Sequence, residues 1–196
     1  PEDISVTPPL PAVYESDDRL KERCILSFDA MNTAGSTAAY RYFALSADGR
    51  VADISVISDK VNPYLLDIVI TQSDHEVGTA SQELIDIVQA ALDPDTVRPV
   101  CDRPIVRSSI TTNYQINARL YVAKNAENSL LLEATEIRLN KYIEYTKRIG
   151  QSIHLSAIYA ALHVDGISRV ELISPATDIA IDKFHHAYCS EKSIVI

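Results

Sequence analysis

The sequence predicts an α+β fold made of two small mixed α/β subdomains, with mostly antiparallel or mixed sheets and packed helices. Helical and strand periodicities are interspersed along the chain, without the strict strand–helix–strand alternation of a doubly wound parallel sheet. The 196 residues are enough for one domain or two small ones. With 46% hydrophobic and 23% charged residues, the composition is ordinary for a globular protein and argues against disorder.

We expect the chain to divide into three parts. Residues 1–14 are a proline-rich linker, residues 15–110 a middle α+β subdomain, and residues 111–196 a C-terminal α+β subdomain. The closely spaced prolines of the first segment keep it extended. Because the chain opens in this segment without an initiating Met, we expect a further N-terminal portion in the complete protein.

The middle subdomain opens with two predicted helices. Ser16 is a suitable N-cap for the first, and Ser36 for the second. Apolar residues follow each cap at helical spacing. The stripe of the first helix is Leu20, Cys24, Phe28 and Met31, and that of the second is Tyr40, Phe43, Ala44 and Ala47.

Strands and a third helix complete this subdomain. Alternation predicts a strand over Val51–Ile57, and the nearly all-apolar run Leu65–Thr71 predicts a central strand covered on both faces. Thr79 and Gln82 form a capping box for a helix that Asp93-Pro94 ends. The segment Val97–Ile110 contains prolines, which predicts an edge or bulged strand.

The C-terminal subdomain begins with the clearest strand signal in the chain, the alternation over Tyr114–Val122. A long helix is expected over Asn128–Arg148, followed by Gly150 on its C-terminal side, and a short helix over 155–162. Three short strands are expected after these helices: Val170–Ile173, Asp178–Ile181 and Ser193–Ile196.

Three stretches, by their order and spacing, carry a resemblance to one protein family. They are Glu15–Arg23 with Thr33–Gly35 and Ala39–Ala47, Asp95–Arg103, and Leu155–Ile167 with Arg169–Leu172 and Ser174-Pro175. Together they resemble the baseplate J-like family, the wedge proteins of contractile phage tails. The similarity runs from about residue 10 to the end of the chain, and it departs mainly over 58–78, where Ser73–Gly78 replaces a more glycine-rich loop.

This resemblance implies a structural role. Such proteins sit around the tail hub in a sixfold arrangement, where they contact copies of themselves and other baseplate wedge subunits. We therefore expect the chain in the virion tail baseplate, after assembly in the host cytoplasm. The family has no catalytic residues to carry over, so the resemblance implies that the protein is not an enzyme and holds no cofactor.

Several other classes of function are disfavoured by the sequence. A net charge of −9 repels phosphate and disfavours nucleic-acid partners. No apolar run approaches the roughly 20 residues that a membrane span needs. Three scattered cysteines without a CxxC pair make a zinc site improbable. No phosphate-binding or hydrolase motif points to a small-molecule substrate.

The alternative is a tail-associated cell-wall hydrolase domain, which needs a pair of carboxylates. The candidate pairs are Asp17-Asp18 and Glu133 with Glu136, but a helix start and a solvated helix face explain them better. His185-His186 is the most tempting metal feature, and two surface histidines in a connection are the favoured interpretation. We expect no catalytic, cofactor-binding or metal-binding residues.

The candidate interaction residues are Arg98, Arg103 and Arg107, the one local basic cluster of interest in this acidic chain. Arginine suits protein interfaces because its planar fork of donors binds carboxylates well. Internal pairing with Asp93, Asp95 and Asp102 explains the cluster equally well, so both interpretations stay open. Partly exposed tyrosines are also compatible with an interface. Those expected to be partly exposed are Tyr121, Tyr142 and Tyr145.

Overall fold

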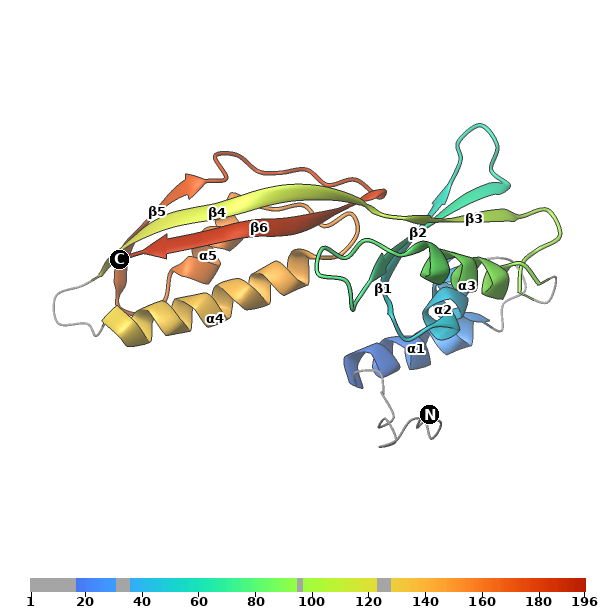
Figure 1. Cartoon of the computed structure of the whole chain (residues 1–196), viewed down its shortest axis with the longest axis horizontal. Helices are drawn as coiled ribbons and strands as arrows, with labels where there is room; N and C mark the ends of the chain where they lie inside the picture. The colour runs from blue at the N-terminus through green and yellow to red at the C-terminus, as the bar shows by residue number, and fades with distance from the viewer. Residues whose placement is uncertain (1–16, 31–35, 95–96, 123–127) are drawn as a thin grey trace.

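The computed structural model describes residues 17–30, 36–94, 97–122 and 128–196. It confirms the predicted α+β class, since the described residues form five helices and two three-stranded sheets (Figure 1). Each sheet contains one antiparallel and one parallel pair of strands. The elements in order are α1 (Asp17–Ala30), α2 (Thr37–Ala47), β1 (Val51–Ser58), β2 (Leu65–Gln72), α3 (Gln82–Leu92), β3 (Arg103–Ser108), β4 (Ile110–Val122), α4 (Asn128–Thr146), α5 (Leu155–Leu162), β5 (Ile167–Ser174) and β6 (His185–Val195).

The elements from α1 to β3 form what we call the middle lobe. Its sheet has the strand order β1-β2-β3, so β2 is central and β3 is an edge strand, as predicted. The helices pack on one face of this sheet, below it in Figure 1. The core joins β2 side chains such as Ile68 and Ile70 to Tyr40 of α2 and Leu84 of α3. Ser36 caps α2 as predicted, because its hydroxyl accepts a hydrogen bond from the Ala39 amide at 3.1 Å.

The start of α3 differs from the predicted capping box. The N-cap is Ser81, whose hydroxyl accepts from the Leu84 amide at 3.3 Å. Thr79 instead lies before the helix, where its hydroxyl bonds to His75 Nδ1 at 3.1 Å. The sequence offered two hydroxyl residues within one helical turn, and the position of the backbone bend selects Ser81.

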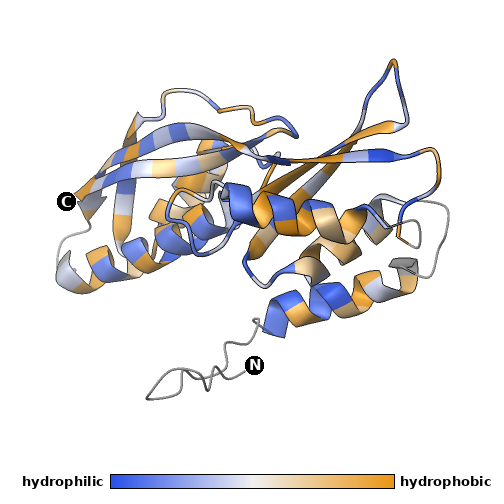
Figure 2. Ribbon diagram, turned by 45° about the vertical axis from the view of Figure 1, so that its right-hand side comes forward, coloured by the Kyte–Doolittle hydropathy of each residue, from blue (hydrophilic) through white to orange (hydrophobic). Residues whose placement is uncertain are grey.

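Helix α1 forms where predicted, but most of its apolar stripe faces solvent. Leu20, Cys24 and Phe28 are exposed, and Leu26 packs against the core instead. Hydrophobic residues recur along this outlying helix in Figure 2. Arg19 holds α1 to α2 through the carbonyls of Leu45, Asp48 and Gly49, which lie at the C-terminal end of α2. The predicted cap Ser16 and the stripe residue Met31 lie outside the described residues.

The elements from β4 to β6 form the C-terminal lobe. Its sheet has the order β5-β4-β6, and α4 and α5 cover one face. The predicted alternation along β4 is confirmed, because every second side chain enters the core. These buried residues are Tyr114, Ile116, Ala118 and Leu120.

The last third of this lobe corrects three predictions. No strand forms over 178–181, where Ile179 makes only an isolated bridge to Ile153. The expected terminal strand is instead part of the long strand β6, which begins at His185 and pairs in parallel with β4. His186 is therefore not a surface residue of a connection, since it lies in β6 with 0% of its surface exposed. Parallel pairing with a partner far away in sequence leaves no local signature.

Candidate interaction surfaces

The two lobes are joined by an extended stretch that passes directly from one sheet into the other. β3 ends at Ser108 and β4 begins at Ile110, so only Ser109 separates them. Figure 1 shows the two strands as one long ribbon that crosses the molecule. Because β3 pairs with β2 and β4 pairs with both β5 and β6, this ribbon belongs to both sheets at once.

His186 fixes the junction from the other side. Its Nε2 lies 2.7 Å from the carbonyl oxygen of Val77 in the middle lobe, and its Nδ1 lies 2.8 Å from Ser109 Oγ. A neutral ring satisfies both contacts, with Nε2–H donating to the carbonyl and Nδ1 accepting from the hydroxyl. Burial lowers the pKa of His186 below its ordinary value, which favours this neutral form.

Further polar contacts cross the junction. The amide of Ile149 donates to Asp53 Oδ2 at 2.9 Å, and the hydroxyl of Tyr188 donates to Glu76 Oε1 at 3.3 Å. Asp53 is also held by Arg41, whose guanidinium lies 3.5 Å from Oδ1. These bonds link α2, β1, β6 and the loops around them, so the two lobes are held together as one body.

The structure gives the three candidate arginines different surroundings. Arg98 donates to the main-chain carbonyls of Asp93 and Asp102, at 2.7 and 3.1 Å. Arg103 also donates to the Asp102 carbonyl, at 3.0 Å. Asp93 and Asp102, which were expected to pair through their carboxylates, thus accept these bonds through their main-chain oxygens. The third expected acid, Asp95, lies outside the described residues. Arg98 is half-buried in the loop, whereas Arg103 is exposed.

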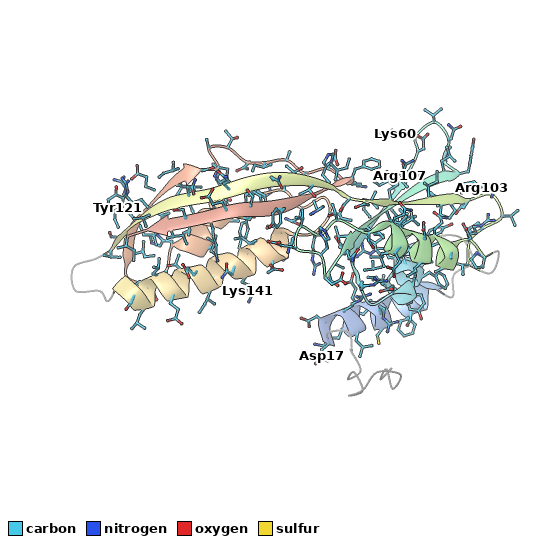
Figure 3. All side chains as sticks on the ribbon, viewed as in Figure 1. Asp17, Lys60, Arg103, Arg107, Tyr121 and Lys141 are labelled. Carbon is cyan, nitrogen blue, oxygen red and sulfur yellow. The ribbon has the colours of Figure 1, made fainter. Side chains whose placement is uncertain are left out.

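Arg103 and Arg107 share the outward face of β3 with Ile105. We call this set the β3 face. It lies opposite the helices, and all three side chains are exposed. Arg107 makes an ion pair with Asp67 of β2 at 2.6 Å, whereas the guanidinium of Arg103 donates to the main-chain carbonyls of Val100 and Asp102. Figure 3 places both arginines at the same end of the molecule as Lys60.

The carboxylates considered for catalysis do not converge. Asp17 and Asp18 are exposed on α1 of the middle lobe, and Asp18 pairs with Lys21 at 3.3 Å. Glu133 and Glu136 are exposed on α4 of the C-terminal lobe. The two pairs lie on different lobes, so the four carboxylates do not face one another across a shared site.

The exposed histidines are engaged in local pairs. His185 Nδ1 lies 2.6 Å from Asp182, and His154 Nδ1 lies 3.0 Å from Asp178. A hydrogen bond from His185 is the largest cause that lowers the pKa of Asp182, whereas for Asp178 it is the bond from the Leu155 amide. Within the described ranges, no three His, Cys, Asp or Glu residues are grouped as metal ligands would be. No described helix is long and apolar enough to cross a membrane.

Two structural features were not predicted from the sequence. The first is the junction at His186, because its partners are 77 and 109 residues away along the chain. The second is a groove between α4 and α5, lined mainly by aromatic and small side chains. The exposed positions of α4 carried a readable signal, since Leu130, Ile137 and Tyr145 recur there at helical spacing.

Comparison with known proteins is consistent along the whole chain. Two sequence profiles match it, the Baseplate J-like central domain over residues 32–108 and the Baseplate J-like protein C-terminal domain over residues 114–191. The chain is 43% identical over 195 residues to baseplate protein J of Escherichia phage P2. That match covers all of this chain and 64% of the relative, so the chain spans somewhat less than two thirds of the relative's length.

A solved structure has a similar fold. It is a chain in the cryo-EM structure of the anti-feeding prophage baseplate, 6-fold symmetrised, with a TM-score of 0.60. The likeness covers 91% of this chain and 42% of that chain at 11% identity, which is evidence for the fold alone. The two profile matches and the identity to the phage P2 protein together show that the chain belongs to the baseplate J-like family.

Proposed function

We propose that the chain is part of a structural subunit of the baseplate wedge in a contractile phage tail or tail-like particle. The observation that carries this proposal is its similarity over its full length to baseplate protein J. The architecture supports it, because two lobes locked by buried polar contacts form a rigid body that can hold neighbours at fixed positions. The protein works by geometry and not as an enzyme.

The proposal includes place and partners. The subunit assembles with its partners in the host cytoplasm and is incorporated into the tail baseplate, where it contacts other wedge subunits and copies of itself. Repeated weak interfaces in such an assembly reinforce one another, so no single contact has to be strong. We propose that residues 15–110 and 111–196 are the two subdomains that make these contacts. Residues 1–14, the proposed linker, lie outside the described residues.

The β3 face is our proposed contact for an acidic surface on another wedge subunit. It combines an exposed apolar residue, Ile105, with the cations of Arg103 and Arg107 in a chain of net charge −9. Arginine beside apolar surface is a common composition at protein interfaces. Arg98 contributes to this face indirectly, because its hydrogen bonds to the carbonyls of Asp93 and Asp102 hold the loop that leads into β3.

Co-expression with the other wedge proteins of the same particle tests the proposal, with the mass of purified complexes measured by light scattering. The wild-type chain is expected to form a complex of defined stoichiometry. Arg103→Ala combined with Arg107→Ala should weaken that complex about tenfold or more. Arg119→Ala, which removes an exposed cation from the open face of β4, is the matched control and should leave binding unchanged.

The possible outcomes separate the two claims. A wild-type chain that binds no wedge subunit would contradict the baseplate role. A double variant that binds like the wild type would contradict only the assignment of the β3 face. Circular dichroism of the free variants checks that folding is intact.

A further inference from the structure

Strand β3 is an edge strand, and the side of it that faces away from β2 is occupied by one side chain. The amide of Arg103 donates to the carbonyl of Tyr64, just before β2, at 2.7 Å. Successive residues of a strand direct their main-chain groups to alternate sides, so those of Pro104 and Val106 point away from β2. Such an edge presents main-chain groups to which a strand of another molecule can bond.

Gln89 of α3 bonds to both of these residues. Its Nε2 donates to the carbonyl of Pro104 at 3.0 Å, and its Oε1 accepts from the amide of Val106 at 2.9 Å. A residue of a parallel neighbouring strand would bond to the same two groups, so the side-chain amide occupies the place of that residue. Helix α3, which packs beside β3 in Figure 1, thus supplies one peptide-like group to the edge.

A third hydrogen bond fixes the orientation of the Gln89 amide. Its Nε2 also donates to Asp93 Oδ1 at 2.8 Å, so both hydrogens and the oxygen of the amide have partners. A flipped amide would direct its oxygen at two acceptors and its hydrogens at the Val106 donor. The surrounding groups therefore select the orientation that bonds to β3.

The opposite edge of the same sheet, strand β1, is also covered by a helix side chain. The amide of Asp59, just beyond β1, donates to the Leu65 carbonyl at 3.0 Å, so by the same alternation the main-chain groups of Ile54 point away from β2. Arg41 of α2 donates to the Ile54 carbonyl, and Glu22 of α1 bonds to that guanidinium at 2.8 Å. Each edge of the middle sheet thus has an outward carbonyl that accepts from a helix side chain.

We propose that Gln89 blocks strand addition at the free edge of β3. The strand that it excludes is β3 of a second copy, which carries the same outward main-chain groups and would pair with it about a twofold axis. With this edge blocked, β3 meets other subunits through the side chains of the β3 face. The inference goes beyond the proposed function, because it concerns a contact that the chain avoids whichever partners it has.

Three substitutions on α3 test the inference. Gln89→Ala opens the edge, because it preserves helix propensity and leaves the Pro104 carbonyl and the Val106 amide without their partner. Gln82→Ala is the matched control, since Gln82 makes the same kind of bond to an aspartate four residues on, Asp86 at 2.8 Å, within the exposed part of α3. Gln89→Glu can still accept from Val106 but cannot donate to Pro104, and its charge opposes strand pairing at an edge.

Sedimentation equilibrium measures association of the 21.7 kDa chain, and hydrogen exchange followed by NMR measures protection of the Val106 amide. Gln89→Ala should associate at a concentration about tenfold or more below that of the wild type, whereas Gln82→Ala and Gln89→Glu should behave as the wild type does. In dilute Gln89→Ala, the Val106 amide should exchange about tenfold faster than in the wild type. It should become protected again on association, because it then bonds to the second copy.

Four results would overturn the inference. A loosened fold alone would make both Gln89 variants associate equally, and a general effect of α3 would make Gln82→Ala associate. The third is a Gln89→Ala variant, folded by circular dichroism, that associates no more than the wild type or stays unprotected at Val106 when it does. The fourth, a Val106 amide that exchanges freely in the wild type, needs no variant. Binding to other wedge subunits is measured separately, so none of these results decides the baseplate role.

Discussion

Replacing His186 with alanine tests whether the junction holds the two lobes together. The substitution removes a fully buried ring and leaves Ser109 Oγ and the Val77 carbonyl without their partner. Each unsatisfied buried polar group costs about 1–3 kcal/mol, so His186→Ala should lower the free energy of unfolding by about 2–5 kcal/mol. Since the ring connects the lobes, one cooperative transition should separate into two.

Urea denaturation followed by circular dichroism and by tyrosine fluorescence measures both effects. His185→Ala is the matched control, because this neighbour makes only a partly exposed pair with Asp182 and should cost less than about 1 kcal/mol. In the double variant with Ser109→Ala, the total loss should be smaller than the sum of the single losses, since the orphaned hydroxyl is gone. A loss below about 0.5 kcal/mol for His186→Ala, with coincident transitions, would refute the junction as we describe it.

Three further outcomes follow from the same contacts. Burial is the main cause that lowers the pKa of His186; the charges of Lys147 and His185 lower it further, and the bond to Val77 opposes the shift. The unfolded chain therefore binds more protons than the folded chain, so stability measured by denaturation should be full above about pH 6.5 and fall as the pH drops toward the folded pKa. His186→Leu should remove this pH dependence. Gly78→Ala should destabilise the fold by about 1–3 kcal/mol in thermal unfolding, because φ is 92° and the new Cβ would lie 3.2 Å from His186 Nε2; an unchanged Tm would contradict the geometry. Arg19→Ala should expose α1 to limited proteolysis, since it removes the bonds to three carbonyls at the end of α2, and a cleavage rate equal to that of the wild type would show that these bonds do not hold the helix.

Local patterns predicted most of the elements. β4 is recognisable because strict alternation over Tyr114–Val122 has one physical cause, a sheet with one buried and one wet face. Ser36 was identifiable as a cap because the residue before a helix needs a short side-chain acceptor. Such features depend on neighbours in sequence, which the sequence displays directly.

The errors occur where distant residues decide the structure. Leu20, Cys24 and Phe28 have the spacing of a buried helix face, yet they are exposed, because nothing in the described part of the chain packs over them. His186 has no local feature that marks it as buried; its environment is set by Ser109 and Val77, which the fold brings to it. The same holds for the candidate arginines, whose partners include Asp67 of a neighbouring strand rather than only the nearby acids.

The edges of the C-terminal sheet are poor templates for strand addition. β5 and β6 are both edge strands, and an unpaired edge invites pairing with any other strand. Both ladders are interrupted by register shifts, between Tyr114 and Gln115 opposite β6 and at Asn117/Ala118 and Tyr121/Val122 opposite β5. Such irregularities bend an edge and weaken it as a template for strand addition. Strand addition has no built-in limit, whereas a contact between two complementary side-chain surfaces fixes one neighbour in one orientation. A particle with a defined number of subunits needs the second kind of contact, which is the kind that we propose for the β3 face.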